Sequence, residues 1–310
     1  MSLFPVFRQI AVLFLLMGVG YAANRLHIMT KESERLFSRV LVNLTCPALI
    51  LSSVMTSGRL DSGWALLQIF GVAVGYFVLL PVVARLLARL LRVPTVHRAE
   101  YESMLVYSNL GFMGIPVISA VLGTDAILYI SIFMAVFNVS VFSYGTILLQ
   151  PAAQKADKLP LRKMINPGTV SAALALILYA LDIQLPDLIY QPVSLLGNVT
   201  TPLAMLVVGS SLAGQPLRVV LRETSMLPFT ACRLMLLPLL TLAVCRPFVA
   251  DPLLLGTLTL VSAMPVASNV VMISSELGRD TDYISKGVFF STLFFIISIP
   301  LVSAVLNVLG

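Results

Sequence analysis

The chain has 310 residues, of which 58% are hydrophobic and only 11% are charged, and its mean hydropathy is +0.98. Soluble globular proteins do not carry so much apolar surface, so the composition excludes that class and predicts a polytopic membrane protein. The net charge of +6 does not indicate a nucleic-acid partner, because the basic residues are dispersed over loops between apolar runs. The three cysteines lie within apolar runs, where they resemble small hydrophobic residues rather than a disulfide framework.

Apolar runs of about 20 residues are long enough to cross a membrane as helices. The first run begins near Pro5 without a basic leader or a cleavage site, so we expect a full span there and no signal peptide. The sixth run is the shortest. In chain order, we expect ten membrane-spanning helices at 5–25, 34–56, 63–91, 101–122, 125–149, 167–182, 193–213, 219–246, 252–277 and 283–309.

The distribution of lysine and arginine predicts the orientation of these helices. Most of the 20 basic residues fall at the loops that follow the first, third, fifth, seventh and ninth runs. The positive-inside rule therefore places those loops in the cytoplasm and both termini outside. Arg8, Arg59 and Arg246 fall on the opposite side, and Arg233 lies inside the eighth run.

A polar, basic linker at residues 151–166 divides the chain into a first half, 1–150, and a second half, 167–310. Each half holds an odd number of runs, so the second half enters the membrane in the opposite orientation. The spacing N-x-T-x-P occurs at Asn43–Pro47 and again at Asn198–Pro202, and the same register aligns Ser108–Pro116 with Ala263–Val271. We therefore predict an all-α fold of ten transmembrane helices, built as two inverted five-helix repeats.

Two runs are interrupted where an unbroken helix would be expected. The fourth run reads SNLGFMGIP and the ninth reads MPVASN at mid-depth. Proline removes a backbone donor and clashes with the preceding turn, so each place predicts a helix break. Broken backbone at membrane depth persists only where it is buried or lines a wet cavity, and paired breaks indicate a transporter's binding site. The interrupting residues are Asn109, Gly111, Gly114 and Pro116 in the fourth run, and Pro265, Ser268 and Asn269 in the ninth.

If both helices break at the membrane centre, each second half begins there with free N–H groups and partial positive charge, which suit an anion. Asn109 and Asn269 would add neutral amide donors. The alternative is that glycine and proline are simply common in membrane helices, and that the asparagines form hydrogen bonds across helices.

Three further residues are candidates with open roles. The breaks near Asn43 and Asn198 either line the same cavity or act only as hinges. Arg233 either supplies positive potential to an anion path, or extends to the membrane surface, or caps carbonyls freed by a break.

The sequence has no aspartate or glutamate at mid-depth in any run, and both histidines fall near run ends. Sodium sites and proton relays usually use an intramembrane carboxylate. No pattern typical of a catalytic nucleophile or a metal site is present either. We therefore expect a protein that is not an enzyme and that uses no cofactor or metal.

Ten runs in two inverted fives, with SNLGFMGIP and PVASN in the interrupted pair, resemble the auxin efflux carrier family. Its bacterial members include malonate and malate carriers, and the short linker resembles those members rather than the plant ones. The resemblance implies a scaffold of spans one, two, six and seven, and a mobile domain of the other six. It also implies elevator-like movement, a homodimer, and a carboxylate held where the broken helices cross, with Asn109, Asn269, Pro116 and Pro265 matching the family's crossover residues.

We therefore expect a carrier for a small organic anion in a bacterial inner membrane, with membrane lipid and a second copy of the chain as partners. The first alternative is a sodium- or proton-coupled symporter of the bile-acid/sodium symporter type on the same fold. The second is a membrane sensor or an intramembrane enzyme.

Overall fold

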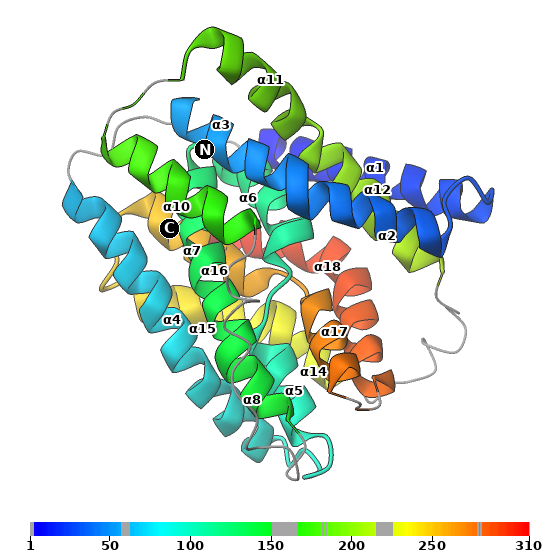
Figure 1. The fold of residues 1–310 in the computed structure, drawn as a ribbon. Helices are drawn as coiled ribbons and strands as arrows, with labels where there is room; N and C mark the ends of the chain where they lie inside the picture. The colour runs from blue at the N-terminus through cyan, green and yellow to red at the C-terminus, as the bar shows by residue number, and fades with distance from the viewer. Residues whose placement is uncertain are drawn as a thin grey trace.

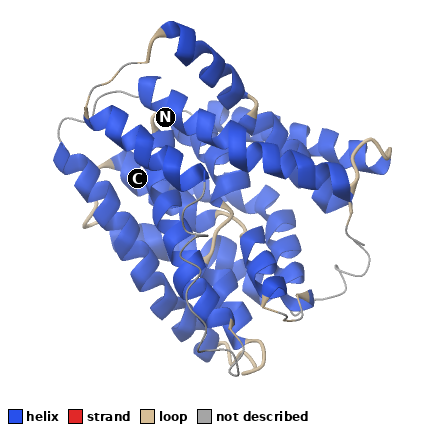
Figure 2. Ribbon diagram, in the orientation of Figure 1, coloured by secondary structure: helices blue, strands red, loops and turns tan. Residues whose placement is uncertain are grey.

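The computed structural model describes residues 3–56, 63–150, 167–181, 183, 185–214, 226–277, 279 and 281–309. Within these ranges the chain is almost entirely helical and forms no sheet (Figures 1 and 2). The predicted linker at 151–166 lies outside the described residues, as does the basic loop that carries Arg218 and Arg222. The nearly all-helical architecture predicted from composition is confirmed.

The first half of the chain supplies these elements: α1 (Leu3–Arg25); α2 (Lys31–Val40), η1 (Leu41–Thr45) and α3 (Cys46–Thr56); α4 (Gly63–Leu90); α5 (Arg98–Val106), η2 (Leu110–Gly114) and α6 (Ile115–Leu122); α7 (Ala126–Ser140), η3 (Val141–Gly145) and α8 (Thr146–Leu149). The elements marked η are single π-helical turns.

The second half supplies α10 (Pro167–Ala180); α11 (Asp187–Asn198) and α12 (Thr200–Ala213); α14 (Met226–Ala231), η5 (Cys232–Leu236) and α15 (Leu237–Cys245); α16 (Pro252–Ala263) and α17 (Ser268–Glu276); and α18 (Asp282–Leu309). Each predicted run contains helix.

Six stretches of the described chain are long and apolar enough to cross a membrane: Lys31–Ser52, Trp64–Leu90, Ala126–Leu149, Asp187–Ala213, Met226–Cys245 and Asp282–Leu309. Ala11–Arg25, Leu110–Leu122 and Pro252–Ala263 are apolar but shorter, and the last two belong to the runs in which breaks were predicted. The count of ten spans and their inverted symmetry stay predictions.

Several predicted helix starts lie later in the chain than the observed ones, and two of them have a local explanation. The second run was expected to begin at residue 34, but α2 begins at Lys31, because Thr30 and Ser33 form a reciprocal capping box around its first turn. The seventh was expected from residue 193, but α11 begins at Asp187 and continues through Pro192. Asp187 suits the positively charged first turn of a helix, although it resembles a loop residue when hydropathy alone is considered.

Three π turns share one local cause. η1, η2 and η5 are each followed at the same spacing by a proline, namely Pro47, Pro116 and Pro238. Proline lacks the helical N–H and clashes with the carbonyl four residues earlier, so one widened turn relieves the conflict without ending the helix. Pro202 of the second N-x-T-x-P motif is accommodated differently, in the first turn of α12 directly after the turn at Val199.

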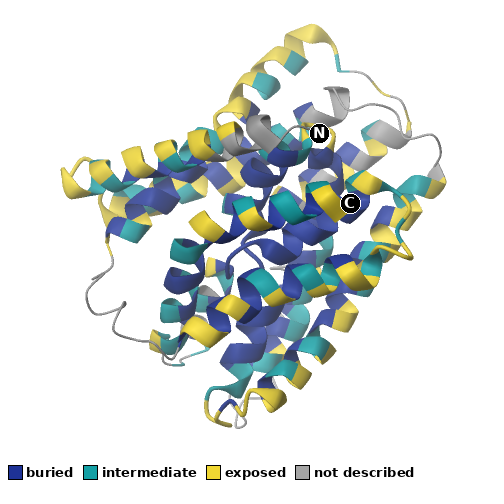
Figure 3. Cartoon of the chain, turned by 180° about the vertical axis from the view of Figure 1, so that it is seen from behind, coloured by how far each residue is buried: buried dark blue, intermediate teal, exposed yellow. Residues whose placement is uncertain are grey.

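The helices pack into two groups (Figure 1). The first, which we call the α1/α12 layer, consists of α1, α2, η1, α3, α10, α11 and α12. Its most extensive contact joins α1 to α12, where a Cβ on Gly209 would lie 1.9 Å from the Met17 carbonyl oxygen and a Cβ on Gly20 would lie 2.2 Å from that of Leu206. The remaining elements form the second group, which we call the crossover body. Buried residues concentrate in the interior of the molecule (Figure 3). The outer face of α4 exposes apolar side chains such as Leu67 and Val78.

Candidate functional site

The fourth run breaks at residues 107–109, at the start of the predicted segment, whereas Gly111, Gly114 and Pro116 lie in the helical structure that follows. α5 ends at Val106, and Tyr107 takes an extended conformation with φ −100° and ψ 110°. Helical structure resumes at Leu110 with Asn109 as the N-cap, whose side-chain oxygen accepts a hydrogen bond of 3.2 Å from the Phe112 N–H. The polar amide therefore has a local role, because it satisfies a donor that the break leaves without a helical partner.

The ninth run breaks as well. α16 ends at Ala263, and Met264 is extended with φ −65° and ψ 148°. α17 then begins at Ser268. Pro265 lies between the two half-helices, where its missing N–H prevents the α16 hydrogen-bond ladder from continuing.

The two breaks meet. Ser108 and Val266 form an isolated antiparallel bridge. The Asn109 N–H donates to the Pro265 carbonyl at 2.8 Å, and the Ala267 N–H donates to the Tyr107 carbonyl at 3.0 Å. Backbone groups released by one broken helix are thus paired with those released by the other, which removes most of the cost of leaving them unpaired in an apolar interior.

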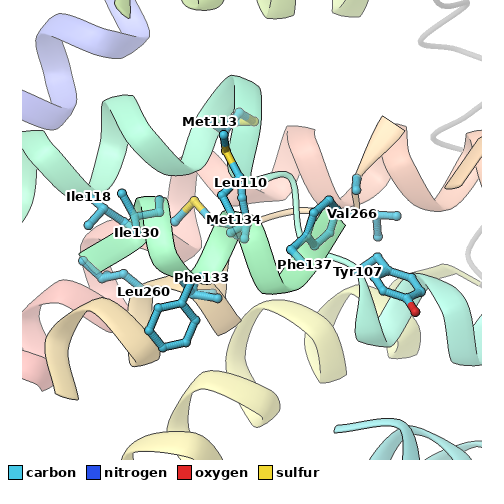
Figure 4. Close-up of a cluster of buried hydrophobic side chains, with 14 of the residues drawn as sticks. Tyr107, Leu110, Met113, Ile118, Ile130, Phe133, Met134, Phe137, Leu260 and Val266 are labelled. Atoms are coloured by element: carbon cyan, nitrogen blue, oxygen red, sulfur yellow. The ribbon is translucent and has the colours of Figure 1, made fainter. Parts of the chain in front are cut away.

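The place where the two broken helices meet, which we call the crossing, packs against α7 (Figure 4). The Tyr107 ring meets Phe137 edge-on, with ring centroids 5.7 Å apart and planes at 82°. Its hydroxyl donates to the Ser140 carbonyl at 3.0 Å. Gly145 permits this approach, because a Cβ there would lie 2.9 Å from the ring of Tyr107. The extended segment is therefore held in one position by packing as well as by hydrogen bonds.

Arg233 also holds the extended segment around Tyr107 in place, through hydrogen bonds. Its side chain is fully buried in η5. Nη1 donates to the Leu105 carbonyl at 3.0 Å, and Nη2 donates to the Ser108 hydroxyl at 2.5 Å. In an unbroken helix the Leu105 carbonyl would accept from Asn109, whose N–H instead pairs with Pro265. Of the open roles for Arg233, the capping of a freed carbonyl is the one that these bonds support.

A cavity of about 700 Å³ opens beside the crossing, between the α1/α12 layer and the crossover body. That volume is in the range of small-molecule sites. Asn109 and Ser268 are the predicted residues that line it. The other lining residues are Glu34, Arg35, Ser38, Arg39, Phe112, Val207, Val208, Ser211, Leu212, Val271, Thr281, Ser285, Val288, Phe289 and Thr292.

The other crossover residues are not among those that line the cavity. Asn269 is half-buried, and Pro116 and Pro265 are buried. The Gly111 carbonyl lies 3.8 Å from the Cys46 sulfur of the α1/α12 layer. A Cβ on Gly114 would lie 3.0 Å from the Ile130 side chain of α7. Gly114 thus sits close against α7, while Gly111 lies at the boundary between the two groups of helices.

The structure does not bring Asn43 or Asn198 into the cavity. Both side chains are exposed, and the Asn43 amide donates to the Arg39 carbonyl at 2.8 Å, one turn earlier in its own helix. Of the two interpretations left open for the N-x-T-x-P motifs, the described cavity lining does not support the first, in which they line the same site.

Sequence reasoning missed the charged wall of the cavity. Arg35 and Arg39 were counted only as cytoplasmic basic residues, and Glu34 and Ser38 were not singled out, but all four follow one face of α2. Their spacing of i, i+1, i+4 and i+5 was the available signal, because such residues share one side of a helix.

The three charged residues of this wall have different surroundings. Glu34 accepts hydrogen bonds from Ser210 of α12 and from Asn24 of α1, at 3.3 Å for the latter. Within the described chain, neither Arg35 nor Arg39 has a carboxylate within ion-pair distance. Glu34 therefore ties α2 to its own layer, and the two guanidinium groups carry the cavity's remaining charge.

Buried carboxylates do occur in α5, although at its first turns and not at the crossing. Glu100 lies 2.9 Å from His97 and 3.6 Å from Arg279, and Glu102 lies 3.6 Å from Arg85. Among the residues searched, no group of three or more His, Cys, Asp or Glu could hold a metal ion.

Comparison with known proteins agrees with this architecture. Residues 5–303 match the sequence profile described as membrane transport protein. The chain belongs to that family, the auxin efflux carrier family. A protein of Methanothermobacter thermautotrophicus named "Uncharacterized transporter" is 23% identical over 291 residues, which cover 93% of this chain and 94% of that protein. A protein of Rhizobium meliloti named "Putative malonate transporter" is 24% identical over 289 residues, covering 90% of this chain and 89% of that protein. The expected family is confirmed.

Proposed function

We propose that this member of the membrane transport protein family is a secondary carrier for a small organic anion, a carboxylate such as malonate or malate. The observation that carries the proposal is the cavity beside the crossing of two broken helices, lined by Asn109 and Ser268. The relative named as a malonate transporter supports the same class of substrate.

Asn109 is suited to an anion because of its capping role. Its side-chain oxygen is occupied by the Phe112 N–H, which fixes the orientation of the amide. The NH₂ group is then the end that remains for a ligand, and it offers two neutral donors. Ser268, at the first residue of α17, adds the partial positive charge and free N–H groups of a helix N-terminus.

The proposed transport cycle is elevator-like. The cavity has one wall on the α1/α12 layer and the other on the crossover body, so a shift of one group past the other would carry the crossing with its ligand. Close glycine packing of α1 on α12 suits the layer to a static scaffold. A homodimer through that scaffold, an inverted-repeat origin for residues 1–150 and 167–310, and a bacterial inner membrane complete the proposal. Because α2 and Thr281 adjoin loops predicted to be cytoplasmic, we assign the cavity to the inward-open state.

The proposal is tested by uptake of radiolabelled malonate and malate into proteoliposomes. Asn109→Ala removes the amide but also the cap, worth about 1 kcal/mol. Asn109→Asp is the sharper variant, because it keeps the capping oxygen while replacing the donor end with a negative charge. We expect both to abolish uptake, and Asn109→Asp to melt at the wild-type temperature.

Asn307→Ala is the matched control, because that amide only donates to the Ser303 carbonyl within α18. Wild-type uptake by Asn109→Asp would refute the assignment of the site. Repeating the assay with choline in place of sodium, and with an imposed pH gradient, distinguishes the symporter alternative.

A further inference from the structure

We propose that Arg35 and Arg39 form a second anion subsite on the wall opposite the crossing, and that the carrier therefore selects dicarboxylates over monocarboxylates. One carboxylate would lie at Asn109 and Ser268, and the other at the two guanidinium groups of α2. The inference rests on the proposed function and adds the substrate's second charge to it.

The geometry of α2 places the two arginines together. They are four residues apart, about 6 Å along the axis and on the same side of the helix, and both line the cavity. Ser38 lies between them on that face and adds a hydroxyl. Guanidinium groups bind carboxylates through paired N–H donors, so two on one face can hold one carboxylate from both sides.

The charges that line the cavity are distributed unequally between its walls. The described lining has Glu34, Arg35 and Arg39 as its charged residues, and all three belong to α2. The wall formed by the crossover body offers the neutral polar groups Asn109, Ser268, Thr281, Ser285 and Thr292. A ligand that matches both walls carries anionic oxygen at each end.

Glu34 does not neutralise the arginine pair in this structure. Its Oε1 accepts from the Ser210 hydroxyl and from the Asn24 amide, and these bonds hold the carboxylate against α12 and α1. The arginines thus face the cavity without a carboxylate from the described residues of either wall. An anionic ligand that enters the cavity from solution would supply the negative charge that the two arginines lack.

The two subsites lie on different groups of helices. Arg35 and Arg39 belong to the α1/α12 layer, and Asn109 and Ser268 belong to the crossover body. Both subsites contact one ligand only while the groups hold their present arrangement. A dianion is therefore bound more tightly in this state than in a state where the crossing has moved away from α2.

The test compares malonate with malonamate, which has the same carbon chain but carries a neutral amide in place of one carboxylate. Binding of each is measured by titration calorimetry on the detergent-purified full chain. We expect the wild type to bind malonate at least about 10-fold more tightly, a difference of about 1.4 kcal/mol. In Arg35→Gln/Arg39→Gln we expect the ratio to fall to about 2 or less, with malonamate affinity preserved.

Arg89→Gln is the matched control, because Arg89 is an exposed basic residue in the last turn of α4 and does not line the cavity. Asn109→Asp should weaken both ligands. If the ratio of malonate to malonamate affinity in Arg35→Gln/Arg39→Gln stays at the wild-type value, the arginine subsite is refuted but the proposed function is not. The two arginines would then be solvated residues at the edge of the cavity that do not bind the ligand. An equal loss of both ligands in that variant would also refute the arginine subsite. If neither acid nor any longer dicarboxylate binds the wild type, the proposed function itself fails.

Discussion

Replacing Arg233 should loosen the crossing of the two broken helices. Arg233→Met removes two hydrogen bonds from a charged donor, one to the Leu105 carbonyl and one to the Ser108 hydroxyl, each worth about 1.5–3 kcal/mol. Part of that loss is offset, because the variant no longer buries a charge whose desolvation costs several kcal/mol. We expect a net loss of about 2–4 kcal/mol, which for a chain of 310 residues corresponds to a melting temperature lower by about 3–6 °C.

The assay is thermal unfolding of the detergent-purified chain. The fraction of protein that remains folded after heating is measured by aggregation or by size-exclusion chromatography. Arg233→Lys should fall between wild type and Arg233→Met, because an ammonium group keeps the charge but lacks the planar fork that reaches both acceptors. Arg246→Gln is the control, since Arg246 is exposed just beyond the end of the same run of helix. Unchanged melting of Arg233→Met would refute the capping role. A selective loss of dianion binding in Arg233→Lys would instead show that its charge acts on the substrate.

Two further predictions concern the packing of α1 on α12 and the second broken helix. Gly209→Ala should prevent the chain from folding into a monodisperse protein, as measured by size-exclusion chromatography, because the new Cβ would overlap the backbone of α1. Gly18→Ala is the control, because its Cβ meets no atom within 4 Å, and this variant should elute like the wild type. Stable, monodisperse Gly209→Ala would show that α1 and α12 can separate at little cost. Ser291→Ala should lower the free energy of unfolding by about 1–3 kcal/mol, because it leaves the buried Val266 N–H without its acceptor. Ser298→Ala on the same helix should cost much less, since that hydroxyl only donates back to a helical carbonyl, and equal melting shifts for the two serine variants would contradict this account.

Much of the crossing could be predicted from local sequence. The glycines and the proline of SNLGFMGIP, and Pro265 in the ninth run, predicted two helix breaks. The fourth run breaks just before its glycines, at residues 107–109, while Gly111, Gly114 and Pro116 lie in the π turn and the helix that follow. Both breaks are present, and they contact each other. The sequence left the role of Arg233 open, because three roles were compatible with a single cation inside an apolar run. Only the position of the Leu105 carbonyl, 128 residues away in the chain, decides among them.

The composition, and the prolines and glycines that interrupt the apolar runs, were sufficient to predict a helical membrane protein with two broken helices. Hydrophobicity and proline geometry act over a few residues, so they can be evaluated from local sequence. The tertiary structure decided which residues face the cavity. Asn43 and Asn198 share a motif, yet both point away from it, whereas Arg35 and Arg39, which resemble ordinary loop-flanking charges, form its wall. Which face of a helix meets a cavity depends on the rotation imposed by its packing partners, and for α2 these include Ser210 of α12, which lies 176 residues away in the chain.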